Sequence, residues 1–229
     1  MSNTKDDLLS DADHTSVVWD IPLRVFHWGL VAATIGSVIT SKIGIMFWHE
    51  KFGLTILGLI GFRVIWGFVG SHHARFRNFM VSPSAVLRYI KARVQGDKTY
   101  HPGHAPTGAY ATILILAVFS TMALLGTMAN DDILYEGPLA TYVGAFTDDA
   151  RRYHHLMENV IFGVIILHLS AMVMYRIALK INLIPAMVHG GRDKAVQPPS
   201  QTVQVMGVML MITMVALSQS LGLLGDRFY

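Results

Sequence analysis

Five apolar stretches, each about 20 residues long, constrain the fold of this chain more than any other feature. They cover residues 21–41, 52–70, 108–128, 154–176 and 202–223. A helix needs about 20 mostly apolar residues to cross the hydrocarbon core of a bilayer. The chain is 52% hydrophobic and 14% charged, whereas soluble domains carry roughly 25% charged residues. We therefore expect an all-α membrane protein that crosses the bilayer five times.

Three sequence regions follow from this pattern. Residues 1–20 are rich in aspartate and are expected to form a polar tail, without the pattern of a cleaved signal peptide. Residues 21–190 hold the first four spans. Residues 191–229 hold a polar linker and the fifth span, which we expect at the periphery of the bundle.

The composition excludes several classes of protein. The chain has no cysteine, which rules out disulfides, thiolate-held iron–sulfur clusters and covalently attached c-type haem. The formal net charge of +3 does not predict a nucleic-acid partner, because the basic residues lie in loops and form no basic–aromatic surface.

Charge in the loops predicts the orientation of the spans. Lysine and arginine collect in the loops that face the cytoplasm. Loops 71–107 and 177–201 are basic, whereas loop 129–153 is mainly acidic. We expect a cytoplasmic N-terminus and a C-terminus on the outer side. Within the first basic loop, Ser82-Pro83-Ser84 predicts the start of a helix that lies at the lipid surface and ends near Gly96.

Four histidines lie inside or at the edge of these apolar spans, at positions 27, 49, 154 and 168. A histidine inside the membrane marks a functional site by default. His154 and His168 are 14 residues apart on span four. That spacing places them within about 40° on one helix face and about 21 Å apart along the axis.

With this orientation of the spans, the four histidines form two pairs, and the members of each pair lie at the same depth in the membrane. His27 and His168 fall towards the cytoplasm, and His49 and His154 towards the outer surface. Each pair can give one iron two imidazole ligands, which is the bis-histidine ligation of a haem. The sequence therefore predicts two stacked, non-covalent haems held between the spans. Any one of these histidines alone would more often be an ordinary interfacial residue.

Other polar residues of the spans have alternatives. His155 competes with His154, but it points about 140° away from His168 on the helix, so we favour His154. Arg63 follows His49 by 14 residues, at the expected depth of the inner haem. It either binds a haem propionate or extends to the cytoplasmic headgroups. Histidines in or beside the cytoplasmic loops are expected to be solvated: His72, His73, His101, His104 and His189.

Several motifs together resemble the prokaryotic cytochrome b561 family, in particular its branch similar to the cytochrome b subunit of nickel–iron hydrogenases. The resemblance runs from about Val18 to Gly190. The motifs are WDIPLRVFHW at 19–28, WHEKFG at 48–53, FRVIWGFVG at 62–70, RFRNF at 75–79, GHAPTGA at 103–109, YEGPLA at 135–140 and HHLMENVIFGVIILH at 154–168. Ala105 departs from the usual GHNPxG pattern, which leaves a role for that asparagine in doubt here.

The resemblance implies a four-helix transmembrane bundle that carries two haem b groups, with His27, His49, His154 and His168 at the family's ligand positions. It implies a bacterial inner-membrane protein of the respiratory chain that transfers electrons between the quinone pool and a periplasmic partner. That partner would be a hydrogenase, another oxidoreductase or a c-type cytochrome. The protein would act as an electron carrier or as a subunit of a quinone-linked oxidoreductase, and a homodimer is compatible with the sequence.

Two other functions remain open on the sequence. The first is a haem-containing membrane anchor without quinone activity. The second is a histidine-based transporter of divalent metal ions, although such sites usually bring carboxylates or several ligands to one depth.

Overall fold

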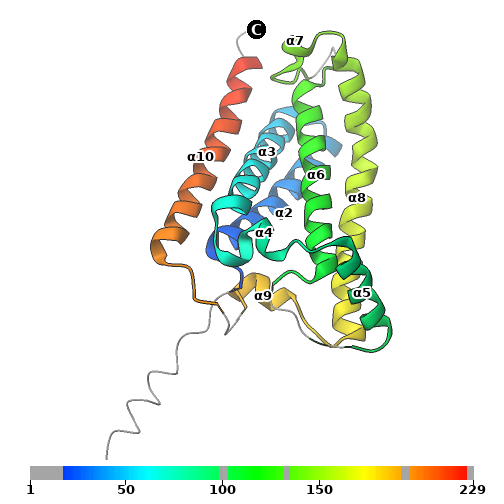
Figure 1. The fold of residues 1–229 in the computed structure, drawn as a ribbon. Helices are drawn as coiled ribbons and strands as arrows, with labels where there is room; N and C mark the ends of the chain where they lie inside the picture. The colour runs from blue at the N-terminus through cyan, green and yellow to red at the C-terminus, as the bar shows by residue number, and fades with distance from the viewer. Residues whose placement is uncertain (1–17, 98, 100–102, 132–134, 192–195, 226–229) are drawn as a thin grey trace, which may run out of the picture.

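The computed structural model describes residues 18–97, 99, 103–131, 135–191 and 196–225. Most of the predicted polar tail (1–17), His101 and the last four residues lie outside these ranges. The described residues form helices and connecting loops and no named β-strand (Figure 1). Five helices are long and apolar enough to cross a membrane: α2 (Ile21–Lys42), α3 (Met46–Val69), α6 (Pro106–Met128), α8 (Phe146–Ala178) and α10 (Gln201–Gly225).

The expected fold class, an all-helical membrane protein with five spans, is confirmed. Helix α2 begins where its sequence predicts, because Asp20 caps it: its Oδ1 accepts the Leu23 amide at 2.8 Å. Helix α8 begins eight residues before the predicted span. Asp148 and Asp149 lie in its first turn, where negative charge stabilises a helix N-terminus.

Short helices occupy the connections. At one end of the bundle lie η1 (His72–Ala74), α4 (Phe76–Phe79), α5 (Pro83–Val94) and α9 (Ile184–His189), and at the other lies α7 (Ala140–Val143). We refer to these as the α5 end and the α7 end. Helix α5 is the helix predicted after Ser82, whose hydroxyl accepts the Ala85 amide. It ends just before Gly96, which has a positive φ of 94°.

Helix α3 forms the centre of the bundle. It packs against α2, α6 and α10, while α8 packs mainly against α6. Figure 1 shows α10 and α8 on opposite sides of the molecule. Helices α2 and α8 share few contacts among the described residues, and the Lys42–Glu158 ion pair (2.7 Å) joins them at the α7 end. The histidines of the two predicted pairs are therefore carried by helices that pack little against each other.

The fifth helix lies at the edge of the bundle, as expected, but it packs closely against α3. A Cβ atom at Gly58 would lie 2.6 Å from the backbone Cα of Val215, so only glycine allows this approach. The Gln219 side chain donates to the carbonyl of Lys51 (2.8 Å) and the hydroxyl of Thr55 (2.9 Å). Helix α10 thus supports the part of α3 that follows His49.

Candidate haem-binding histidine pairs

The structure brings His49 and His154 together near the α7 end. Their ring centroids are 6.1 Å apart and the ring planes are nearly perpendicular, at 85°. Two metal–imidazole bonds of about 2.0–2.1 Å on opposite sides of one ion require a similar separation of the rings. The helices α3 and α8, which carry these residues, thus place both imidazoles at one depth, as their positions in the sequence predict.

Hydrogen bonds fix the protonation of both rings. The Nδ1 of His49 lies 2.9 Å from the carbonyl oxygen of Ser37, and the Nδ1 of His154 lies 3.0 Å from that of Met122. A carbonyl can only accept, so each Nδ1 must carry the proton and donate it. Each Nε2 then keeps its lone pair. The hydrogen bond from Nδ1 to the carbonyl sets the direction of the ring, as is usual for histidines that bind metal ions.

Small residues surround this pair. The two histidines line one cavity together with Gly53, Gly126 and Tyr135. A Cβ atom at Gly53 would meet nothing within 4 Å, whereas one at Gly126 would lie 3.0 Å from the His154 ring. Gly53 therefore leaves space beside the ligand pair that a side chain would fill, and Gly126 lets α6 approach the ring of His154. Both features fit a planar macrocycle bound between the helices.

A tyrosine from the loop at the α7 end borders the same cavity. The Tyr135 hydroxyl donates to the carbonyl of Gly126 at 3.1 Å. Burial, and then the nearby charge of Glu50, raise the pKa of Tyr135, so its hydroxyl remains protonated. The backbone amide of Leu139 donates to the carbonyl of Thr127 at 2.8 Å. These bonds hold the loop against the mouth of the cavity.

The second predicted pair lies nearer the α5 end. His27 is half-buried on α2, His168 is exposed on α8, and the two are close enough to interact electrostatically. The Nδ1 of His27 is enclosed and has no hydrogen-bond partner among the described residues. A buried polar atom without a partner is uncommon. The structure thus brings the two side chains near each other, but it does not fix their tautomers as it does for His49 and His154.

The neighbour His155 points elsewhere. Its ring is exposed, and its centroid lies 6.3 Å from that of His154. His154, not His155, faces His49 and lines the cavity. This placement agrees with the choice of His154 made from the helical spacing.

Arg63 lies inside the bundle. Only 2% of the residue is exposed, which contradicts the alternative of a side chain that extends to the headgroups. Its guanidinium carbon lies 4.7 Å from the ring centroid of Phe76, while both Nη atoms are buried without a hydrogen-bond partner among the described residues. A buried guanidinium is costly unless an anion accepts its hydrogen bonds. Its two free Nη groups fit a carboxylate, such as a haem propionate.

The expectation that His104 is solvated is wrong. Its ring stacks on Phe79, with centroids 4.1 Å apart, and meets the edge of Trp19 at 4.8 Å. Its Nδ1 is enclosed without a partner among the described residues. Burial, and then the positive charges of Arg63 and His73, lower the pKa of His104 to about 3. The GHAPTG motif predicts no such packing, because its aromatic partners are distant in the sequence.

The pH dependence of stability should report this burial. In the unfolded chain His104 takes up a proton below its ordinary pKa of 6.5, whereas in the folded chain it does so only near pH 3. The free energy of unfolding therefore decreases as the pH falls from 6.5 towards 3. At pH 4.5 the cost is on the order of 2–3 kcal/mol. Between pH 7 and 4.5, we expect the melting temperature of His104→Phe to fall by less than that of wild type. The melting temperatures are measured by circular dichroism. The exposed control His189→Phe should behave as wild type, and equal acid sensitivity of His104→Phe would contradict the assignment.

The described residues also bear on the metal-transporter alternative. No three His, Cys, Asp or Glu side chains in the described ranges converge as a metal-ion site requires. That alternative therefore has no ligand cluster in this part of the chain.

Comparison with known proteins shows the family of the chain. The family model for prokaryotic cytochrome b561 matches residues 18–190, which include all four histidines. The chain belongs to the prokaryotic cytochrome b561 family. It is therefore a multi-pass membrane protein of electron transfer, and membership of this b-type cytochrome family implies haem b.

Curated relatives carry more specific names. The chain is 26% identical over 212 residues to a protein of Azotobacter vinelandii and 27% identical over 214 residues to one of Azotobacter chroococcum mcd 1. A third, from Rhizobium leguminosarum bv. viciae, is 26% identical over 213 residues. Each is named a probable Ni/Fe-hydrogenase B-type cytochrome subunit, and each alignment covers 76% of this chain and 87% of the relative. No solved structure matches the chain.

Proposed function

We propose that this protein is a dihaem cytochrome b of the bacterial inner membrane that transfers electrons between the quinone pool and a periplasmic redox protein. The pairing of His49 with His154 carries the proposal: two imidazoles face each other at 6.1 Å, and each donates its Nδ1 proton to a carbonyl. This arrangement leaves two Nε2 atoms for one iron.

Each pair would hold one haem b. His49 and His154 would hold the iron near the α7 end, and His27 and His168 would hold the iron near the α5 end. When bound, each haem supplies an iron that changes between the ferric and ferrous states by one electron. Because each pair would offer two imidazoles to its iron, the protein would favour electron transfer over oxygen binding. The carbonyls of Ser37 and Met122 hold the outer imidazoles in their ligating orientation.

The distribution of charge supports the orientation. The described loops at the α5 end carry a basic set, namely Arg75, Arg77, Arg88, Lys91, Arg93 and Lys180. The α7 end carries Asp131, Glu136, Asp148 and Asp149 against Arg151 and Arg152. Because basic loops stay in the cytoplasm, the α5 end is cytoplasmic and the α7 end is periplasmic. The pair His49 and His154 then lies nearer the periplasmic partner.

The names of the relatives favour a nickel–iron hydrogenase as that partner, with a c-type cytochrome or another oxidoreductase as alternatives. Proton exchange with a quinone requires a polar side chain close to its headgroup. The candidates are Arg63 and His104 at the α5 end and His155 at the α7 end.

Reduction by a quinol tests the proposal directly. Purified protein that contains haem is mixed with a soluble quinol analogue, and the haem absorbance bands are followed by stopped flow. We expect rapid reduction of both haems. Very slow or absent reduction would favour a membrane anchor whose haems only stabilise the bundle. Protein that forms in the presence of haem but shows no Soret band would overturn the cytochrome assignment altogether.

Replacing the buried arginine should shift one haem potential. In Arg63→Leu we expect the midpoint potential of the haem at the α5 end to fall by on the order of 50 mV, because a positive charge nearby favours the reduced form. Arg63→Lys keeps the charge and should keep most of the potential. The measurement is a redox titration of the α-band in both variants. Identical titrations of Arg63→Leu and wild type would contradict an interaction of Arg63 with that haem.

A further inference from the structure

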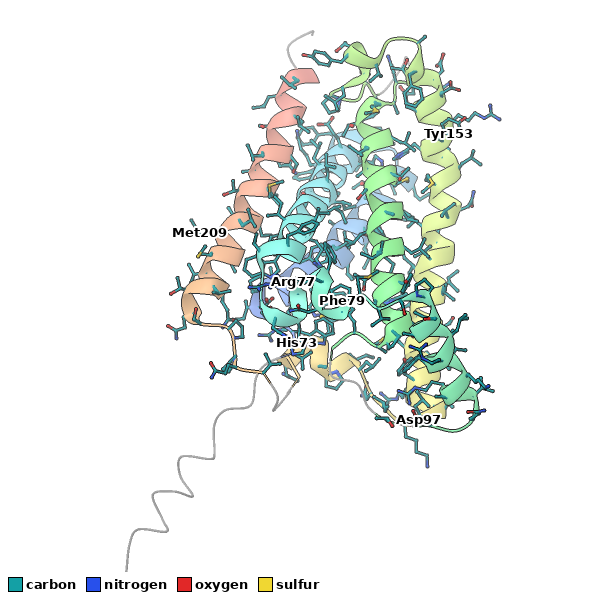
Figure 2. All side chains as sticks on the ribbon, viewed as in Figure 1. His73, Arg77, Phe79, Asp97, Tyr153 and Met209 are labelled. Atoms are coloured by element: carbon teal, nitrogen blue, oxygen red, sulfur yellow. The ribbon has the colours of Figure 1, made fainter. Side chains whose placement is uncertain are left out.

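A second hollow lies at the α5 end, away from the histidine pairs. It encloses about 210 Å³ between the end of α3, the η1 turn and the segment that leads into α10. Figure 2 shows His73, one of its lining residues, at this end of the bundle near Arg77. No part of the proposed electron-transfer function uses this cavity.

The polar wall of the cavity is basic. It contains Ser71, His72, His73 and Arg75, and no aspartate or glutamate is among the described residues that line it. The Nε of Arg75 donates to the carbonyl of Gly70 at 2.7 Å, which fixes the guanidinium against the wall. Neither of the two ion pairs found in the described ranges includes Arg75. Its Nη groups can therefore donate to a ligand.

The opposite wall is apolar and belongs to the membrane spans. Val69 is the last residue of α3, and Val203 lies in the first turn of α10. Val69 is 60% exposed. The cavity thus lies where two spans reach the membrane surface, with basic groups beyond the ends of the helices and apolar groups towards the bilayer. Basic pockets between spans at this level bind anionic lipid headgroups.

We propose that this cavity binds the phosphate headgroup of an anionic glycerophospholipid from the leaflet at the α5 end. Arg75 donates charge-assisted hydrogen bonds to the phosphate, and the two histidines add further donors. Val69 and Val203 contact the start of the acyl chains. The apolar wall favours a lipid over free phosphate. Free phosphate has the negative charge but no acyl chain to contact the two valines. The fifth helix completes the site, because it supplies Val203 to this wall.

Lipid binding to the purified haem-loaded protein tests this site. Native mass spectrometry compares phosphatidylglycerol with phosphatidylcholine, and inorganic phosphate is added as a competitor. For wild type we expect about tenfold tighter binding of phosphatidylglycerol, because the trimethylammonium group of phosphatidylcholine offsets the negative charge of its phosphate beside Arg75. Arg75→Gln should lose most of this preference. Arg77→Gln removes an exposed arginine that does not line the cavity and should keep it.

A second variant guards against misfolding of Arg75→Gln. Val203→Glu brings a negative charge to the cavity and leaves Arg75 itself in place. The Val203 amide already donates to the Ser200 hydroxyl at 3.3 Å, so a glutamate here completes a capping box and is compatible with the helix. We expect this variant to lose the preference for phosphatidylglycerol as well.

Three results would overturn the proposal. Equal binding of the two lipids by wild type would exclude a site that selects a headgroup of net negative charge, and equal losses in Arg75→Gln and Arg77→Gln would indicate only diffuse surface charge. Displacement of the lipid by inorganic phosphate at the same concentration would show an anion site that does not recognise lipid. Loss of the preference in both Arg75→Gln and Val203→Glu, with Arg77→Gln unchanged, supports the site.

Discussion

Protein with His154→Ala should contain half as much haem as wild type, whereas His155→Ala should contain the full amount. The two residues are adjacent, but His154 faces His49 at 6.1 Å and His155 is exposed. The alanine removes one of the two imidazoles that would hold the iron, and it also removes the hydrogen bond to the Met122 carbonyl. Haem per chain is measured by the pyridine hemochrome assay on protein purified by size exclusion. Loss of haem in His155→Ala instead would show that the neighbour is the ligand.

The haem that remains in His154→Ala can be identified without a structure. A redox titration should show one wave where wild type shows two. If the surviving haem is held by His27 and His168, adding Arg63→Leu should shift this wave downward by on the order of 50 mV. If Arg63→Leu does not change the midpoint potential of the remaining wave, His154→Ala has removed the haem at the α5 end and not the one at the α7 end.

Protein with His168→Ala should lose the other haem and keep the one near the α7 end. His168 and His49 are on different helices and belong to different pairs, so the loss should be confined to one site. The remaining wave of the titration should be insensitive to Arg63→Leu. His27→Ala should give the same spectrum and the same haem content as His168→Ala, because both remove a ligand of one iron.

The double variant His154→Ala with His168→Ala controls for indirect effects. It should contain almost no haem, while circular dichroism of the detergent-solubilised protein retains strong helical bands. Loss of both haems in His168→Ala alone would show that the two sites do not form independently. No loss in that variant would remove His168 from the ligand set.

The apolar pattern predicted the spans well, because length and hydrophobicity alone decide which helices can cross a membrane. The beginning of α3 was less accurate. The helix starts at Met46, six residues before the predicted span, because Glu50 and Lys51 interrupt the apolar run but not the helix. The short helices α4, α7 and α9 were not predicted. Each has four to six residues, too few to show a clear periodicity.

Some features of the site were predicted from the sequence and others were not. Helical spacing on span four favoured His154 over His155, and matched depth paired it with His49, whose ring lies 6.1 Å away in the structure. It did not anticipate the carbonyls of Ser37 and Met122 as partners of the two rings. Those contacts depend on how helices pack against each other, which no local pattern encodes. The burial of Arg63 was left open because one arginine near a helix end fits either environment.

The haem content of the wild-type protein tests the central claim most directly. The pyridine hemochrome assay, combined with quantitative amino-acid analysis of the same sample, gives the number of haems per chain at full occupancy. Two haem b per chain is the expected result. One or none in protein grown with ample haem would contradict the two histidine pairs as ligands.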